Sequence, residues 1–71
     1  MAWSLLASSP TAGELYEKGR KAEKAGRMSE AYLMYSEAAA LEPRNQTYWL
    51  RSQSVRSRAE FEAKFKTPVE K

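Results

Sequence analysis

Gly26 and Pro43 are the two residues that most restrict how this 71-residue chain folds. Proline lacks a backbone N–H and its ring clashes with the preceding helical turn, so a helix has to end just before it. Glycine tolerates the left-handed backbone that commonly follows the last turn of a helix. Gly26 and Pro43 therefore predict three separate segments, and each segment carries its own signals for a helix.

The first segment starts with a capping box. The Thr11 hydroxyl can accept a hydrogen bond from the amide of Glu14, whose carboxylate can reach back to the amide of Thr11. Small and apolar residues then recur at intervals of four and three, the period of one helix face; they are Leu15, Gly19, Ala22 and Ala25. The pattern predicts a helix from Thr11 to Gly26, with one face small enough for a second helix to approach closely.

The second segment predicts another helix, from Ser29 to about Glu42. Ser29 is suited to cap its N-terminus, and Met28 is placed to pack on Leu33 as a hydrophobic staple. The expected inward face consists of Ala31, Tyr35, Ala38 and Ala39, with Tyr32 and Leu41 at its edges. Because only a few residues link the first two helices, we expect them to be antiparallel neighbours.

The third segment predicts a helix from Gln46 to about Lys66, after Asn45 as its cap and before Thr67 and Pro68. Its apolar residues do not form one narrow stripe: Leu50, Phe61 and Phe65 lie apart from Tyr48, Val55 and Ala59. Either this helix is buried on two sides, or its C-terminal half reaches beyond the first two helices. We favour the second arrangement, because the basic residues of the helix prefer water; they are Arg51, Arg56, Arg58, Lys64 and Lys66.

These segments predict one small all-α domain over residues 11–66, an antiparallel helical hairpin plus a third helix. Residues 1–10 are interpreted as a flexible or docking segment, and residues 67–71 as a disordered tail. A chain this short buries only about 60% of the surface that it exposes when unfolded. We therefore expect the open face of the hairpin to be covered, either by Trp3, Leu5 and Leu6 or by a second copy of the domain, which would make a homodimer.

Composition argues against several kinds of chemistry. The chain has no Cys and no His, which removes disulfides, thiol nucleophiles, imidazole bases and the usual zinc ligands. Glu60 and Glu62 are two residues apart on the expected third helix, so they point away from each other. No apolar run approaches the roughly 20 residues that span a bilayer. We expect a protein that is not an enzyme, holds no metal or cofactor and does not insert into a membrane.

Eight residues of the first two helices stand at the spacing of a known repeat; they are Leu15, Gly19, Ala22, Gly26, Ala31, Tyr35, Ala38 and Pro43. Through them, residues 12–45 resemble the tetratricopeptide repeat, a helix–turn–helix unit of about 34 residues. The resemblance implies that Gly19 and Ala31 permit a close helix crossing, which Tyr35 fills. Lys18 departs from the apolar residue usual at its position. Trp49 falls where a following repeat places its first large core residue, so the third helix is expected to cover the hairpin.

A longer set of residues carries a narrower resemblance. Residues 15–27, 31–43 and 48–53 are similar to the N-terminal region of certain bacterial secretin-type proteins, the outer-membrane pores of type II and III secretion and of type IV pilus systems. This resemblance implies a periplasmic or cell-envelope domain of a larger protein. Without it, the expected compartment is the cytoplasm.

The leading hypothesis for function is a protein–protein interaction module. In tetratricopeptide arrays the first helix of each repeat lines a concave face. By that analogy the residues facing a partner would be Tyr16, Arg20, Glu23 and Lys24 from the first helix, with Leu50, Ser54 and Arg58 from the third. A tyrosine beside arginines suits an extended peptide with an acidic or aromatic group. The family's carboxylate clamp uses Lys and Asn on this face, so Tyr16 and Arg20 do not favour chaperone-tail recognition.

Two other functions stay open. A microtubule-interacting-and-trafficking-type three-helix bundle would bind a partner helix, although the early Pro43 and the short second helix argue against it. A nucleic-acid site would place Arg51, Arg56 and Arg58 on phosphates, with Trp49 or Tyr48 stacked on a base. Glu60 and Glu62 interrupt that basic patch, and the net charge is a modest +3 with a pI near 9.4, so we expect no nucleic-acid partner.

Overall fold

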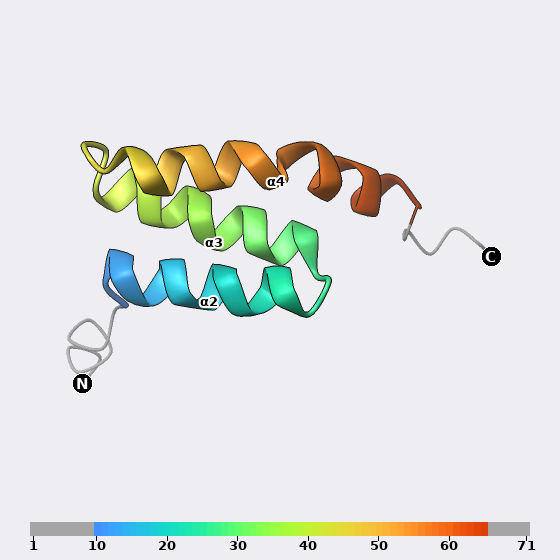
Figure 1. Ribbon diagram of the computed structural model, residues 1–71, viewed down its shortest axis with the longest axis horizontal. Coiled ribbons are helices and arrows are strands. Elements are labelled where there is room, and N and C mark those ends of the chain that lie inside the picture. The colour runs from blue at the N-terminus through green and yellow to red at the C-terminus, as the bar shows by residue number, and fades with distance from the viewer. Residues whose placement is uncertain (1–9, 66–71) are drawn as a thin grey trace, which may run out of the picture.

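The computed structural model describes residues 10–65, which form three helices and, within that range, no strand. Helix α2 spans Ala12–Lys24, α3 spans Met28–Leu41 and α4 spans Gln46–Phe65. The helices run antiparallel to their neighbours and lie side by side, with α3 between α2 and α4 (Figure 1). The predicted all-α array of a helical hairpin plus a third helix is therefore confirmed. The expectations for Trp3, Leu5 and Leu6, and for the tail at 67–71, lie outside the described residues.

Both ends of α2 form as the sequence predicts. The backbone N–H of Thr11 donates to Oε1 of Glu14 at 2.9 Å, and the Thr11 hydroxyl accepts from the amide of Glu14 at 3.1 Å. At the other end Gly26 has φ +83°, and the amides of Gly26 and Arg27 donate to the carbonyls of Glu23 and Ala22. This pair of bonds is a Schellman cap, which a glycine permits because it has no Cβ. Ala25, predicted as part of the inward stripe, is exposed instead, because the helix has already ended there.

The start of α3 differs from the prediction. Ser29 is not its N-cap: the helix begins at Met28, and the capping residue Arg27 makes no side-chain hydrogen bond to it. The carboxylate of Glu62, on α4, accepts from the amides of Met28 and Ser29, each at 2.9 Å. An anion at a helix N-terminus satisfies free amides and complements the helix dipole. The predicted staple is also wrong, because Leu33 is 51% exposed while Met28 packs on the core.

The link from α3 to α4 follows the sequence closely. Helix α3 ends at Leu41 with Glu42 as its cap, one residue before Pro43. The Asn45 side chain then accepts a hydrogen bond from the amide of Thr47 at 3.0 Å, as a capping residue does. Helix α4 begins at Gln46, where it was predicted to begin.

The core is built mainly of small residues. One buried cluster holds Ala22, Ala31, Tyr35 and Val55, and the other holds Ala12, Leu15 and Ala38. Tyr16 packs against both clusters and so joins them. Gly19 lies directly under the Tyr35 ring, where an added Cβ would be 2.6 Å from two ring carbons. The absence of a side chain at Gly19 therefore makes the close approach of α2 and α3 possible.

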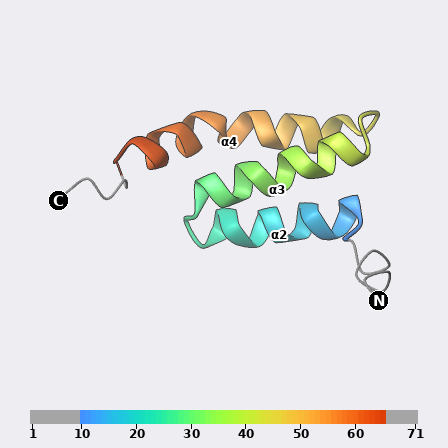
Figure 2. The same ribbon diagram turned by 180° about the vertical axis from the view of Figure 1, so that it is seen from behind.

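Helix α4 packs on the core through one of the two apolar groups that the sequence separates, and the expectation that Trp49 is a core residue is wrong. Its buried residues are Ser52, Val55 and Ala59, with Tyr48 half-buried beside them, whereas Trp49 is 54% exposed and not in the core. Leu50, Phe61 and Phe65 are exposed as well, so the helix is not buried on two sides. Its last turns extend past the start of α3, as expected for the C-terminal half (Figures 1 and 2).

Replacing Gly19 tests the contact between α2 and α3. We expect Gly19→Ala to lower the free energy of unfolding by about 1–3 kcal/mol, because the buried Tyr35 ring has no space to move away from the new methyl group. The matched control is Gly13→Ala, where the nearest atoms lie at 3.9 and 4.0 Å. That change should be neutral or stabilising by up to ~1 kcal/mol, because alanine favours helix. Urea unfolding followed by circular dichroism measures both, and equal effects of the two variants would contradict the prediction.

Replacing Glu62 tests the cap that α4 supplies to α3. We expect Glu62→Ala to cost about 1–2 kcal/mol of unfolding free energy, because two amides at the start of α3 lose their acceptor. Glu60→Ala, two residues away, removes only an exposed pair with Arg56 and should cost less than about 0.5 kcal/mol. The same urea titration compares them. A Glu62→Ala protein as stable as Glu60→Ala would show that the cap contributes nothing.

Candidate functional site

A hollow of about 300 Å³ lies between α2 and α4, and charged side chains line it. Four of the seven predicted partner-binding residues meet there: Arg20, Glu23, Lys24 and Arg58. The fifth lining residue, Arg51, was placed by the sequence only in the alternative nucleic-acid site. Arg51 and Arg58 are seven residues apart, so they fall on the same side of α4. We call this set of five residues the cationic cleft.

Glu23 occupies the centre of the cationic cleft. Its Oε1 accepts a hydrogen bond from the Tyr35 hydroxyl at 2.7 Å and lies 3.7 Å from Nη1 of Arg51. Its Oε2 lies 3.9 Å from Nη1 of Arg58. Glu23 is more buried than either arginine, with 21% of its side chain exposed. The carboxylate of Glu23, on α2, is thus hydrogen-bonded to Tyr35 of α3 and lies close to two arginines of α4.

The cleft keeps an excess of positive charge after these contacts. Its lining contains four cationic side chains and one carboxylate. At its outer edge Arg20 lies 3.8 Å from the carboxylate of Glu17, with both side chains largely in water. Exposed pairs of this kind contribute little and exchange easily. The arrangement is therefore suited to binding an anion that the four cations share.

The other three predicted partner-binding residues do not line the cleft. Tyr16 packs between two other tyrosines, with ring centroids 5.5 Å from Tyr35 and 5.0 Å from Tyr48. Its ring is half-buried and holds the two core clusters together. Leu50 and Ser54 are exposed on α4, and the Ser54 hydroxyl donates to the carbonyl of Arg51. The cleft thus brings together the charged residues of the predicted site and leaves out the other three, and the partner-binding role of all seven stays a prediction.

Tyr35 is the residue whose protonation the site alters most clearly. Burial of its ring, together with the hydrogen bond to the Glu23 carboxylate, raises the pKa of Tyr35 well above its ordinary value of 10.0. Both effects favour the neutral phenol, because a phenolate would be poorly hydrated and would repel Glu23. At neutral pH Tyr35 is therefore a fixed donor that orients Glu23.

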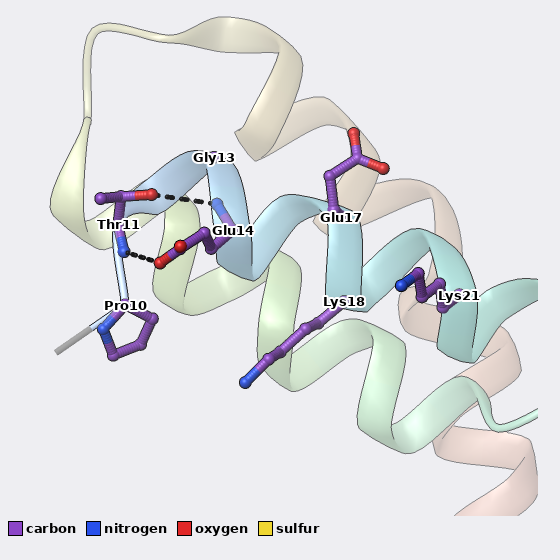
Figure 3. Close-up of a pocket in the computed structure, with 7 residues that line it drawn as sticks. All are labelled: Pro10, Thr11, Gly13, Glu14, Glu17, Lys18 and Lys21. Carbon is purple, nitrogen blue, oxygen red and sulfur yellow. Dashed lines mark hydrogen bonds between the residues drawn. The ribbon is translucent and has the colours of Figure 1, made fainter. Parts of the chain in front are cut away.

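A second hollow, of about 640 Å³, lies along the start of α2 and is lined by Pro10, Thr11, Gly13, Glu14, Glu17, Lys18 and Lys21. Figure 3 shows that the carboxylate of Glu17 and the ammonium of Lys18 point in opposite directions. The carboxylate of Glu14 is engaged in the capping box of α2. We therefore assign no binding role to this hollow.

Several large apolar side chains of the described segment remain in contact with water. They are Leu33, Leu41, Trp49, Leu50, Phe61 and Phe65. Phe61 and Phe65 contact each other edge to face, with ring centroids 4.5 Å apart. The expected homodimer through an open face stays a prediction.

Within residues 10–65 there is no group of three carboxylates that could hold a metal ion. None of the three helices is both long and apolar enough to cross a bilayer. Comparison with known proteins found no matching family model, no similar curated protein and no similar solved structure. The tetratricopeptide and secretin resemblances therefore stay predictions from the sequence.

Removing the Tyr35 hydroxyl tests the link between core and cleft. We expect Tyr35→Phe to cost about 1.5–3 kcal/mol of unfolding free energy at pH 7, the usual range for a hydrogen bond to a charged group. In the native chain the raised pKa of Tyr35 contributes stability that is complete below pH 10.0, the ordinary value, and is lost as the pH rises above it.

The pH dependence of stability distinguishes the contribution of the Tyr35 hydroxyl from that of the other titrating groups. Urea unfolding at pH 7 and at increasing pH above 10.0 should show a smaller loss of stability in Tyr35→Phe than in the native chain. Tyr32→Phe, at a half-buried position outside the cleft, is the control and should retain the native pH profile. Identical profiles for the native chain and Tyr35→Phe would contradict the assigned interaction.

Proposed function

We propose that this protein is a non-catalytic interaction module of tetratricopeptide type, and that the cationic cleft binds an acidic segment of a partner protein. The observation that carries the proposal is the convergence of Arg20, Lys24, Arg51 and Arg58 from two helices around a single carboxylate. One or two carboxylate side chains of the segment can replace water among these cations, and arginine pairs with carboxylates through two parallel hydrogen bonds.

The charge distribution supports a local binding site over a generally basic surface. The cleft carries three more positive than negative side chains, and the whole chain has a formal net charge of +3. The remainder of the sequence is therefore balanced. An acidic ligand is attracted to the cleft, and the field of the cleft raises its rate of association.

The tetratricopeptide part of the proposal is supported by where the eight matching residues lie. Leu15, Gly19, Ala22, Ala31, Tyr35 and Ala38 are buried between α2 and α3, Gly26 turns the chain after α2, and Pro43 follows the end of α3. The small Gly19 under the Tyr35 ring, the turn at Gly26 and the stop at Pro43 agree with the roles that the resemblance implies. In arrays of that type the first helices line the partner-binding face, and α2 and α4 line the cleft here.

Binding of a fluorescently labelled oligoglutamate peptide, followed by anisotropy at several salt concentrations, tests the proposal. We expect saturable binding that weakens as salt rises. The double variant Lys24→Gln/Arg58→Gln should bind the peptide about tenfold more weakly. Tenfold corresponds to about 1.4 kcal/mol, and each of the two lost ion pairs contributes about half of it. Arg44→Gln removes the same kind of charge from the exposed α3–α4 turn and is the control; it should leave the affinity unchanged.

Three results would overturn the proposal. The first is no binding of the peptide at low salt. The second is an equal loss of binding free energy per removed charge in the control, which loses one charge, and in the cleft variant, which loses two; that result would show attraction to net charge alone. The third is tighter binding of a single-stranded oligonucleotide than of the peptide, which would favour the nucleic-acid alternative.

A further inference from the structure

A third hollow opens beside the cationic cleft and shares one residue with it. This hollow measures about 290 Å³ and is lined by Met28, Arg58, Phe61, Glu62 and Phe65. Arg58 also lines the cationic cleft, so the two hollows are adjacent along α4. We call this hollow the phenylalanine hollow, after the rings of Phe61 and Phe65.

The surface of the phenylalanine hollow is apolar despite its two charged residues. The carboxylate of Glu62 accepts hydrogen bonds from the amides of Met28 and Ser29, so it is taken up by the start of α3. Arg58 directs Nη1 towards Glu23, on the side of the cleft. The surface left for a ligand consists mainly of the Met28 side chain and the rings of Phe61 and Phe65. Methionine and aromatic rings adapt well to large apolar side chains.

We infer that the partner segment has two parts: an acidic side chain for the cationic cleft and a large apolar side chain, such as Phe or Leu, for the phenylalanine hollow. This inference rests on the proposed function and adds a chemical specificity to it. An acidic residue alone would be held by charge, which many partners can supply. The neighbouring apolar hollow selects among acidic segments those that carry an apolar side chain at the right distance.

The geometry of α4 sets that distance. The residues of α4 in the cleft are Arg51 and Arg58, and those in the phenylalanine hollow run from Arg58 to Phe65. The midpoints of these two stretches are separated by about seven residues of helix, which is roughly 10 Å at a rise of 1.5 Å per residue. An extended peptide covers about 3.3 Å per residue. The acidic and apolar side chains should therefore be about three positions apart.

An acidic peptide fits this surface better than a second copy of the chain. Of the two adjacent hollows, one is cationic and the other is apolar. A second copy that docked through the same surface would bring its own excess of cations against that of the first, and the like charges would repel. A segment with carboxylates has the complementary charge, and its apolar side chain covers rings that are 54% and 70% exposed.

Three labelled peptides of equal length test the inference by anisotropy. The first carries two glutamates and, about three positions on, a phenylalanine; the second has serine in place of the phenylalanine; the third has the phenylalanine directly beside the glutamates. We expect the first to bind about tenfold tighter than the other two, the gain expected from partial burial of one aromatic side chain.

Variants of the protein show which residues account for the tighter binding of the first peptide. Phe61→Ala/Phe65→Ala should remove the advantage of the first peptide and leave the affinity of the serine peptide unchanged. Leu50→Ala, an exposed apolar residue of the same helix outside both hollows, should keep the advantage. Circular dichroism of each variant shows whether the helices are retained, which is expected because all three side chains are exposed.

The outcomes distinguish this inference from the proposed function. If the three peptides bind the native protein equally, the acidic site stands and the apolar selectivity is refuted. The same conclusion follows if Leu50→Ala removes the advantage as fully as the double phenylalanine variant does. If no peptide binds at low salt, the proposed function fails and the inference fails with it.

Discussion

The contact of the Tyr35 ring with the backbone of Gly19 is the constraint on which the other features depend. It sets how closely α2 and α3 approach, since an added Cβ at Gly19 would lie 2.6 Å from the ring. It also fixes the position of the Tyr35 hydroxyl, which lies 2.7 Å from Oε1 of Glu23. Glu23 in turn sits between Arg51 and Arg58 of α4. The packing of the core and the charge arrangement of the cleft are therefore one connected structure, and neither changes without the other.

Local signals predicted most of the helix boundaries. The capping box at Thr11, the cap at Gly26 and the stop at Pro43 depend on residues a few positions apart, so the sequence contains all the information they need. The start of α3 was misassigned for the opposite reason, because its acceptor, Glu62, lies on another helix. Serine is a residue type that often caps helices, but the hydroxyl of Ser29 donates to the carbonyl of Ala59.

Tertiary packing decided the positions that periodicity left ambiguous. Tyr48 and Trp49 are adjacent aromatic residues on α4 and differ by only about 100° around its axis. The repeat pattern placed Trp49 inside, yet Tyr48 is the residue that meets Tyr16, which α2 supplies. In the candidate site the cations of α2 could be predicted from their shared helix face. Arg51 could not, because its place depends on how α4 lies relative to α2 across α3 and on the charge of Glu23.

The cap that Glu62 provides also bears on how the chain acquires its structure. The amide of Met28 and its acceptor are separated by 34 residues, a long loop to close for two hydrogen bonds. During synthesis α2 and α3 leave the ribosome well before Glu62 does. Until then the first amides of α3 have only water as a partner. The cap at the start of α3 is therefore completed only after α4 has been made, although α3 itself precedes α4 in the chain.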